Sequence, residues 1–67
     1  MNNDWREWER VVSVEQLSEL TDKGKTCYHV GHQRIYPARV LLNWQGREML
    51  TAIKLGYIRI VPGEERN

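Results

Sequence analysis

The stretch SVEQLSELTDKGKTCYHVGHQRIYPARV, residues 13–40, decides the fold of this chain. Apolar residues recur in its first part at three-residue spacing: Val14, Leu17 and Leu20. With polar and acidic residues between them, this spacing predicts an amphipathic helix. Ser13 and Gln16 form the S-x-x-Q pattern of a capping box, which marks the helix start. The helix is expected to end between Thr21 and Gly24, because Asp-Lys-Gly supplies residues that tolerate a turn.

The next segment, residues 25–34, fits two structures. One is a second helix, capped by Thr26, that exposes a row of polar side chains. A helix, a turn and a polar second helix are the usual device for placing side chains in a DNA groove. Gly31 disfavours this helix, because glycine inside a helix costs about 1 kcal/mol relative to alanine. The alternative is a β-hairpin of residues 27–30 and 34–36. We favour the helix and keep the hairpin open.

Residues 38–53 also fit two patterns. As strands, apolar residues alternate from Ala38 to Trp44, a turn at Gln45-Gly46 reverses the chain, and a second strand returns. As a helix, the run begins at Pro37, is weakened by the glycine in its middle and ends at Gly56. We favour the hairpin, which would form a wing, because glycine after a polar residue suits a turn better than a helix interior.

Both ends of the chain carry apolar groups that fit either the core or a contact with a second copy. The β-prone residues 57–61 predict a C-terminal strand, which either completes the sheet or pairs with another molecule. Trp5 and Trp8 lie three residues apart, so one helical turn places both indoles on the same side. We favour core packing for this pair over a homo-oligomer contact, although Trp is common in interfaces.

The length of 67 residues predicts one small domain with polar tails at about residues 1–4 and 62–67. A core of this size seldom contributes more than roughly 3 to 5 kcal/mol, so self-association is an open alternative. Cys27 has no second cysteine for a disulfide, which fits a reducing compartment. The sequence shows neither a signal peptide nor a membrane-spanning run, so we expect a cytoplasmic protein with no membrane partner.

The charges divide along the chain. Residues 1–22 hold six acidic and two basic residues, a balance of −4, whereas residues 23–60 hold seven basic residues against Glu48 alone, a balance of +6. Such asymmetry is expected when one face of a protein meets a polyanion. A solvated surface of mixed charge explains the same counts equally well.

The order SVEQLSEL, GKT, RIYPARV and QGREML resembles the small winged-helix DNA-binding proteins of the excisionase and MerR-like group. Members have a first helix, a turn, a recognition helix, an apolar-Pro stop and a wing with a Gly-Arg turn. The matching positions are Val14, Leu17 and Leu20, then Gly24, Lys25 and Thr26, then Ile35, Tyr36 and Pro37, then Gly46, Arg47 and Glu48. The resemblance implies an α+β fold with a helix-turn-helix and a β-hairpin wing, to which the C-terminal β-strand is added. It also implies an excisionase-like protein or a small regulator of a phage or mobile element.

We therefore predict a protein that binds duplex DNA, without catalytic activity and without a cofactor. Gln and Arg bond base edges, and Lys and Arg suit phosphate oxygens. The candidate nucleic-acid-binding residues are Lys23, Lys25, Thr26, His29, His32, Gln33, Arg34, Arg39 and Arg47. His29 and His32 lack a third ligand at a matching spacing, so no metal site is predicted. No polar group is placed to orient a Cys27–His29 pair, so no catalytic site is predicted.

The alternative function is a small phage-type inhibitor or adaptor that binds a host protein. Three Trp and three Tyr in a short chain supply aromatic anchors for such an interface, and the acidic N-terminal third suits a basic partner. Salt separates the two functions. A protein that contacts about four DNA phosphates should show a log-log salt slope near −3.6, and an aromatic interface should depend on salt much less.

Overall fold

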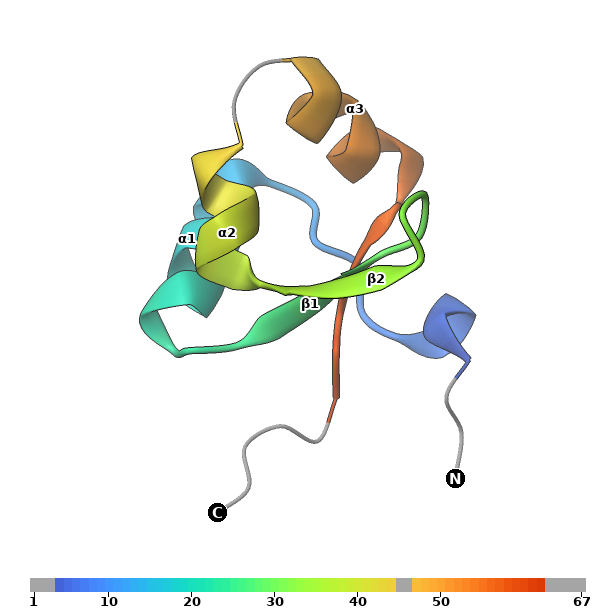
Figure 1. Cartoon of the computed structure of the whole chain (residues 1–67), viewed down its shortest axis with the longest axis horizontal. Coiled ribbons are helices and arrows are strands. Elements are labelled where there is room, and N and C mark those ends of the chain that lie inside the picture. The colour runs from blue at the N-terminus through green and yellow to red at the C-terminus, as the bar shows by residue number, and fades with distance from the viewer. Residues whose placement is uncertain (1–3, 45–46, 63–67) are drawn as a thin grey trace.

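In the computed structural model, which describes residues 4–44 and 47–62, these residues form an antiparallel sheet with the α-helices packed on one side (Figure 1). The elements are the 3-10 helix η1 (Trp5–Glu7), α1 (Val14–Asp22), β1 (Thr26–His29), β2 (Arg34–Pro37), α2 (Ala38–Asn43), α3 (Arg47–Leu55) and β3 (Ile58–Ile60). The strand order is β2-β1-β3. The predicted α+β class is thus confirmed.

Helix α1 confirms the first sequence prediction. The Oγ of Ser13 accepts a hydrogen bond from the N–H of Gln16 at 3.1 Å, and the side chain of Gln16 accepts one from the N–H of Val12 at 2.8 Å. These two bonds satisfy backbone donors near the helix start, as a capping box does. The helix ends where predicted, because Gly24 takes a positive φ of 69° and the N–H of Lys25 bonds back to the carbonyl of Leu20.

The predicted recognition helix over residues 25–34 is wrong, and the hairpin alternative is confirmed. β1 and β2 pair antiparallel, with Cys27 opposite Tyr36 and His29 opposite Arg34. The side chains of Cys27 and His29 are both buried, and residues two apart reach the same face only in a strand. The turn between the strands places Gln33 at a φ of 55°. Burial of alternate residues has therefore outweighed the helical pattern.

The predicted wing over residues 38–53 is also wrong, because α2 and α3 occupy this run. The buried residues of α3 follow a helical period: Met49, Ala52 and Ile53. The helical alternative is confirmed in type and in its end at Gly56, which has a φ of 79°. It differs in detail, since Pro37 is the N-cap of α2 rather than its first residue and Trp44 ends that helix. The predicted wing turn at Gln45-Gly46 lies outside the described residues.

Strand β3 confirms the predicted C-terminal strand and completes the sheet within the molecule by pairing with β1. Its other edge is covered by residues 9–11. The N–H of Val11 bonds to the carbonyl of Ile58 at 2.9 Å, and the N–H of Ile60 bonds to the carbonyl of Glu9 at 2.8 Å. Backbone groups that a second copy would need for pairing at this edge are therefore already used.

The core lies between the sheet and the helices. Its buried residues are Val11, Leu17, Leu20, Cys27, Ala38, Leu41, Met49, Ala52, Ile53 and Ile58. Trp5 and Trp8 are not among them, so the favoured core packing of this pair is wrong. They lie half-buried on the opposite side of the sheet, where the Trp8 ring meets Tyr28 edge-on at 5.9 Å and the Arg59 guanidinium lies over Trp5. Within residues 4–44 and 47–62, no helix has the length and apolar character needed to cross a membrane.

Candidate functional site

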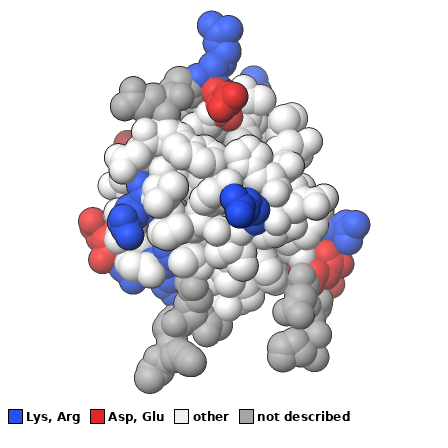
Figure 2. Space-filling view, in the orientation of Figure 1, with Lys and Arg blue, Asp and Glu red and all other residues white. Residues whose placement is uncertain are grey.

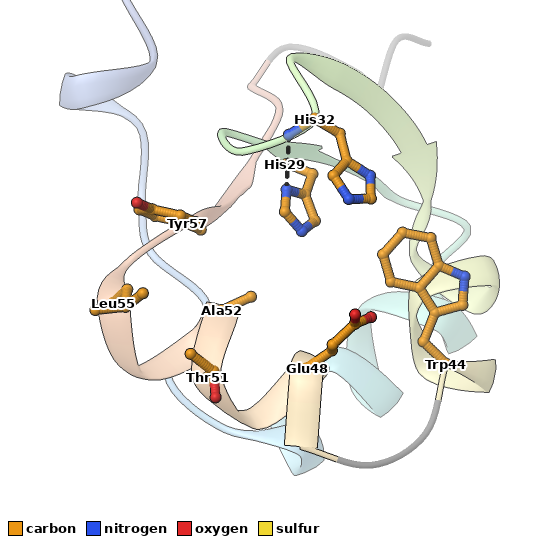
Figure 3. Close-up of a pocket in the computed structure, with 8 residues that line it drawn as sticks. All are labelled: His29, His32, Trp44, Glu48, Thr51, Ala52, Leu55 and Tyr57. Carbon is orange, nitrogen blue, oxygen red and sulfur yellow. Dashed lines mark hydrogen bonds between the residues drawn. The ribbon is translucent and has the colours of Figure 1, made fainter.

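The candidate site is an open hollow of about 160 Å³ between the hairpin end of the sheet and α3 (Figure 3). Its lining comes from four parts of the chain: the hairpin, the end of α2, α3 and the turn before β3. The lining residues are His29, His32, Trp44, Glu48, Thr51, Ala52, Leu55 and Tyr57.

The β1–β2 hairpin places one histidine over another. His29 is the last residue of β1, and the turn that follows folds His32 back onto it. The two rings stack with 4.0 Å between centroids and 17° between planes. The N–H of His32 donates to the Nδ1 of His29 at 3.2 Å, and the Nδ1 of His32 lies 2.9 Å from the hydroxyl of Tyr36. Both imidazoles are therefore held in place by the hairpin.

Two larger aromatic residues extend this pair. Trp44 follows α2, and its ring centroid lies 5.9 Å from that of His29, 5.4 Å from that of His32 and 5.0 Å from that of Tyr36. Tyr57 precedes β3 and lies 6.4 Å from His29 on another side. These edge and tilted contacts are the favourable geometries for aromatic rings. We call His29, His32, Tyr36, Trp44 and Tyr57 the aromatic cluster.

Helix α3 supplies the wall that faces the aromatic cluster. Glu48, Thr51 and Leu55 follow one another at three- and four-residue spacing, so they share one face of the helix. All three are exposed, since the neighbouring face of α3 carries the buried core residues. Figure 3 shows the Glu48 carboxylate directed into the hollow, toward the imidazoles and the indole.

The electrostatics of the hollow are set by a neutral histidine and a carboxylate. Burial lowers the pKa of His29, and the neighbouring His32 lowers it further, while Glu48 acts in the opposite direction. The Nδ1 of His29 accepts a hydrogen bond, so the neutral ring carries its proton on Nε2. An array of aromatic faces beside a carboxylate is suited to non-covalent recognition.

The residues predicted from the sequence do not form one surface. Lys25, Thr26 and Arg39 line a separate hollow of about 300 Å³ where the α1–β1 turn meets the start of α2, and Lys23 and Lys25 line a neighbouring one. His29 is 8% exposed, so it lies beneath the surface rather than on it. The remaining candidates are exposed and lie elsewhere: His32 and Gln33 in the hairpin turn, Arg34 at the start of β2 and Arg47 at the start of α3.

Charge does not gather on the face shown in Figure 2. The side of the molecule seen in this view contains β2 and α2. Most of it is uncharged, with a few single charged side chains, and further charged side chains lie near the edge of the view. The excess of basic residues in the segment 23–60, a balance of +6, therefore does not produce a continuous basic surface on this side.

The sequence interpretation missed six of the eight lining residues: Trp44, Glu48, Thr51, Ala52, Leu55 and Tyr57. The signal for the α3 residues was their helical spacing, which the hairpin interpretation of this run set aside. No local signal links Trp44 with Tyr57, because each ring lies near His29 of β1 and the three residues come from separate elements. Within the described ranges, no group of three or more His, Cys, Asp and Glu side chains has a metal-binding arrangement.

The chain matches no model of a protein family, no curated protein and no solved structure.

Proposed function

We propose that the protein is a non-catalytic binding module, an inhibitor or adaptor, that recognises a partner protein through the aromatic cluster. One observation carries this proposal: the open hollow of about 160 Å³ is walled by aromatic rings from separate elements. Small-molecule sites usually have about 300 to 1,000 Å³. The smaller hollow suits one side chain of a partner protein.

The rim of the hollow supports this function. Leu55 is 57% exposed and Tyr57 is 38% exposed, and both line the hollow. Exposed apolar groups around a concave site mark interaction surfaces, and Trp and Tyr contribute most to the centres of protein interfaces. The backbone around the cluster is held by hydrogen bonds, including that from the N–H of Val30 to the carbonyl of Tyr57 at 2.8 Å. Such a site loses little entropy when a partner binds.

The test uses two leucines of α3 with nearly equal exposure. A library of random peptides displayed on phage is selected on the immobilised protein, and the dissociation constants of selected peptides are measured by fluorescence anisotropy. Leu55→Gln, at the rim, should weaken binding about tenfold, because it replaces the apolar contact with a polar amide and adds no charge. Leu50→Gln is the matched control, since Leu50 is 59% exposed and does not line the hollow. Equal effects of both substitutions would contradict the proposal.

Duplex DNA is a second candidate partner, supported by the hollow that Lys25, Thr26 and Arg39 share. Two cations and a hydroxyl group at one place can bind phosphate oxygens. This contact would involve the DNA backbone, since the predicted recognition helix does not exist. Titration with random-sequence duplex at about 50 and 200 mM salt tests it. Binding that falls steeply with salt and is lost in Lys25→Ala/Arg39→Ala supports a DNA-binding function; no binding at either salt rejects it.

A further inference from the structure

We infer that the hollow takes the guanidinium group of an arginine side chain, which stacks on Trp44 and pairs with the carboxylate of Glu48. This inference rests on the proposed function and names the chemistry of the partner. The partner is a protein that presents an exposed arginine.

The first argument is the carboxylate. Figure 3 shows Glu48 directed into the hollow, and its charge favours the protonated form of His29, which places it near that ring. Within residues 4–44 and 47–62, no Lys or Arg forms an ion pair with Glu48, and no donor bonds to it. An anion therefore faces the hollow with its hydrogen-bonding capacity unused by these residues.

The second argument is the aromatic walls. Trp44 and Tyr57 lie on different sides of the hollow, with His29 between them (Figure 3). The face of an aromatic ring carries negative electrostatic potential, so it attracts a cation placed over it. The indole of Trp is the strongest of these surfaces. Both the aromatic walls and the Glu48 carboxylate thus favour a positively charged ligand.

The third argument is the lack of a competing cation in the hollow. No Lys or Arg is among the described residues that line it. The Nδ1 of His29 accepts a hydrogen bond from the N–H of His32, so it carries no proton, and burial lowers the pKa of His29. The base of the hollow is therefore a neutral imidazole, and a partner's positive charge meets no repulsion from it.

Arginine fits this chemistry better than lysine. Its planar guanidinium can stack on an aromatic face while its edge donates two hydrogen bonds to a carboxylate. The ammonium of lysine is more strongly hydrated and cannot make both contacts in this way. An aliphatic side chain would cover Glu48 without supplying a donor to it.

The test uses a pair of probes with nearly the same shape. The full chain, labelled with ¹⁵N, is titrated with N-acetyl-arginine methylamide and, separately, with the neutral N-acetyl-citrulline methylamide at about pH 7.5, a unit above the ordinary histidine pKa. The arginine probe should give saturable shifts of the Trp44 indole N–H and of the amides of His32, Thr51 and Tyr57. The citrulline probe should give none.

Two variants test the carboxylate and the aromatic wall opposite Trp44. Glu48→Gln should weaken arginine binding about tenfold, because it removes a charge-assisted pair. Glu15→Gln is the matched control, because Glu15 is exposed on α1 and does not line the hollow, and it should leave the affinity unchanged. Tyr57→Leu retains an apolar side chain and removes one ring, so a loss of about twofold to fivefold is expected. An unshifted amide spectrum outside the hollow shows that each variant is folded.

Several results would overturn the inference: no saturable shift with arginine, equal shifts with citrulline, no effect of Glu48→Gln, or tighter binding of N-acetyl-lysine methylamide. Its failure differs from failure of the proposed function. If peptides bind and Leu55→Gln weakens their binding while the arginine probe fails, the module binds a partner through other side chains. If neither the probe nor any peptide binds at the hollow, both proposals fail.

Discussion

At the scale of the residue, His29 shows how a buried polar group becomes part of a site. It is paired on its Nδ1 by the N–H of His32, three residues later, so the turn itself supplies the hydrogen bond that burial requires. The stacked ring of His32 and the rings of Trp44 and Tyr57 surround it. A neutral ring fits this position, because burial and the neighbouring His32 disfavour a protonated ring more than a backbone hydrogen bond and the charge of Glu48 favour it.

The lowered pKa of His29 predicts that stability falls in mild acid. Between the folded pKa and the ordinary value of about 6.5, the unfolded chain binds more protons than the folded chain. The free energy of unfolding should therefore be highest at pH values above the ordinary histidine pKa, and it should decrease as the pH falls below that pKa. Glu48 from α3 opposes this effect, and His32 from the hairpin turn strengthens it. Urea denaturation at a series of pH values measures the decrease.

Two histidine variants separate the causes. His29→Gln should remove this part of the pH dependence, and His32→Gln should reduce it, because one of the two causes of the lowered pKa is gone. An unchanged pH profile in His29→Gln would show that other groups produce the decrease.

Gly56 and Gly24 provide a second prediction at this scale. Both have positive φ values, 79° and 69°, so alanine at either position should cost about 1 to 2 kcal/mol of unfolding free energy. At Gly56 the new Cβ would also lie 2.7 Å from the guanidinium of Arg10, which ends an exposed, flexible side chain and can move aside at little cost, whereas nothing lies within 4 Å at Gly24. The two substitutions should therefore cost similar amounts of unfolding free energy in urea denaturation. A larger loss for Gly56→Ala that disappears in an Arg10→Ala background would show that the guanidinium is held in place.

At the scale of the element, the sequence was sufficient where local signals agreed. For α1, the capping residues, the apolar spacing and the turn glycine all indicated one helix, and the structure has it. Residues 25–34 and 38–53 carried signals for a helix as well as for a β-hairpin. The choice depended on distant partners: Cys27 pairs with both Tyr36 and Ile60, and the N–H of Ala38 bonds to the carbonyl of Lys25 at 3.0 Å. Such contacts are not visible in a local pattern.

The candidate site was partly predictable for the same reason. His29 and His32 were recognised as candidate residues, although for a DNA surface, because they lie in the polar segment 25–34 that was interpreted as a recognition helix. Trp44, Glu48 and Tyr57 come from three other segments, and only the packing of α3 against the hairpin brings them together. A site made of single residues from separate elements has no spacing that sequence analysis can detect.

The cap of α1 gives a prediction at the scale of the element. Ser13→Ala removes the acceptor for the N–H of Gln16, so it should reduce the free energy of unfolding by about 1 kcal/mol in urea denaturation. Ser18→Ala is the control, because Ser18 is exposed within the same helix, and its effect should stay within about 0.5 kcal/mol. Equal losses from both substitutions would show that the cap bond contributes nothing.

At the scale of the whole molecule, the sheet separates two different surfaces. The core and the α-helices occupy one side, and Trp5, Trp8 and the guanidinium of Arg59 lie on the other. Hydrogen bonds from residues 9–11 occupy the outer edge of β3. The hollow lies at the hairpin end of this arrangement, where the helices leave the aromatic rings uncovered. The elements that line the hollow all pack on one small core, so the site depends on the stability of the whole domain.

This dependence predicts that a single core substitution removes most of the free energy of unfolding. Leu41 in α2 is fully buried, and truncation of a buried leucine to alanine costs about 2 to 5 kcal/mol. A core of this size contributes roughly 3 to 5 kcal/mol, so Leu41→Ala should leave a large fraction of the protein unfolded without denaturant. Leu42 is the matched control. It is the next residue of the same helix and is only partly buried, so Leu42→Ala should cost about 1 kcal/mol and remain folded. Dispersion of amide signals and urea denaturation measure both variants. A cooperative transition near the wild-type midpoint for Leu41→Ala would mean that the domain has far more stability than its core accounts for, as a self-associated form would have.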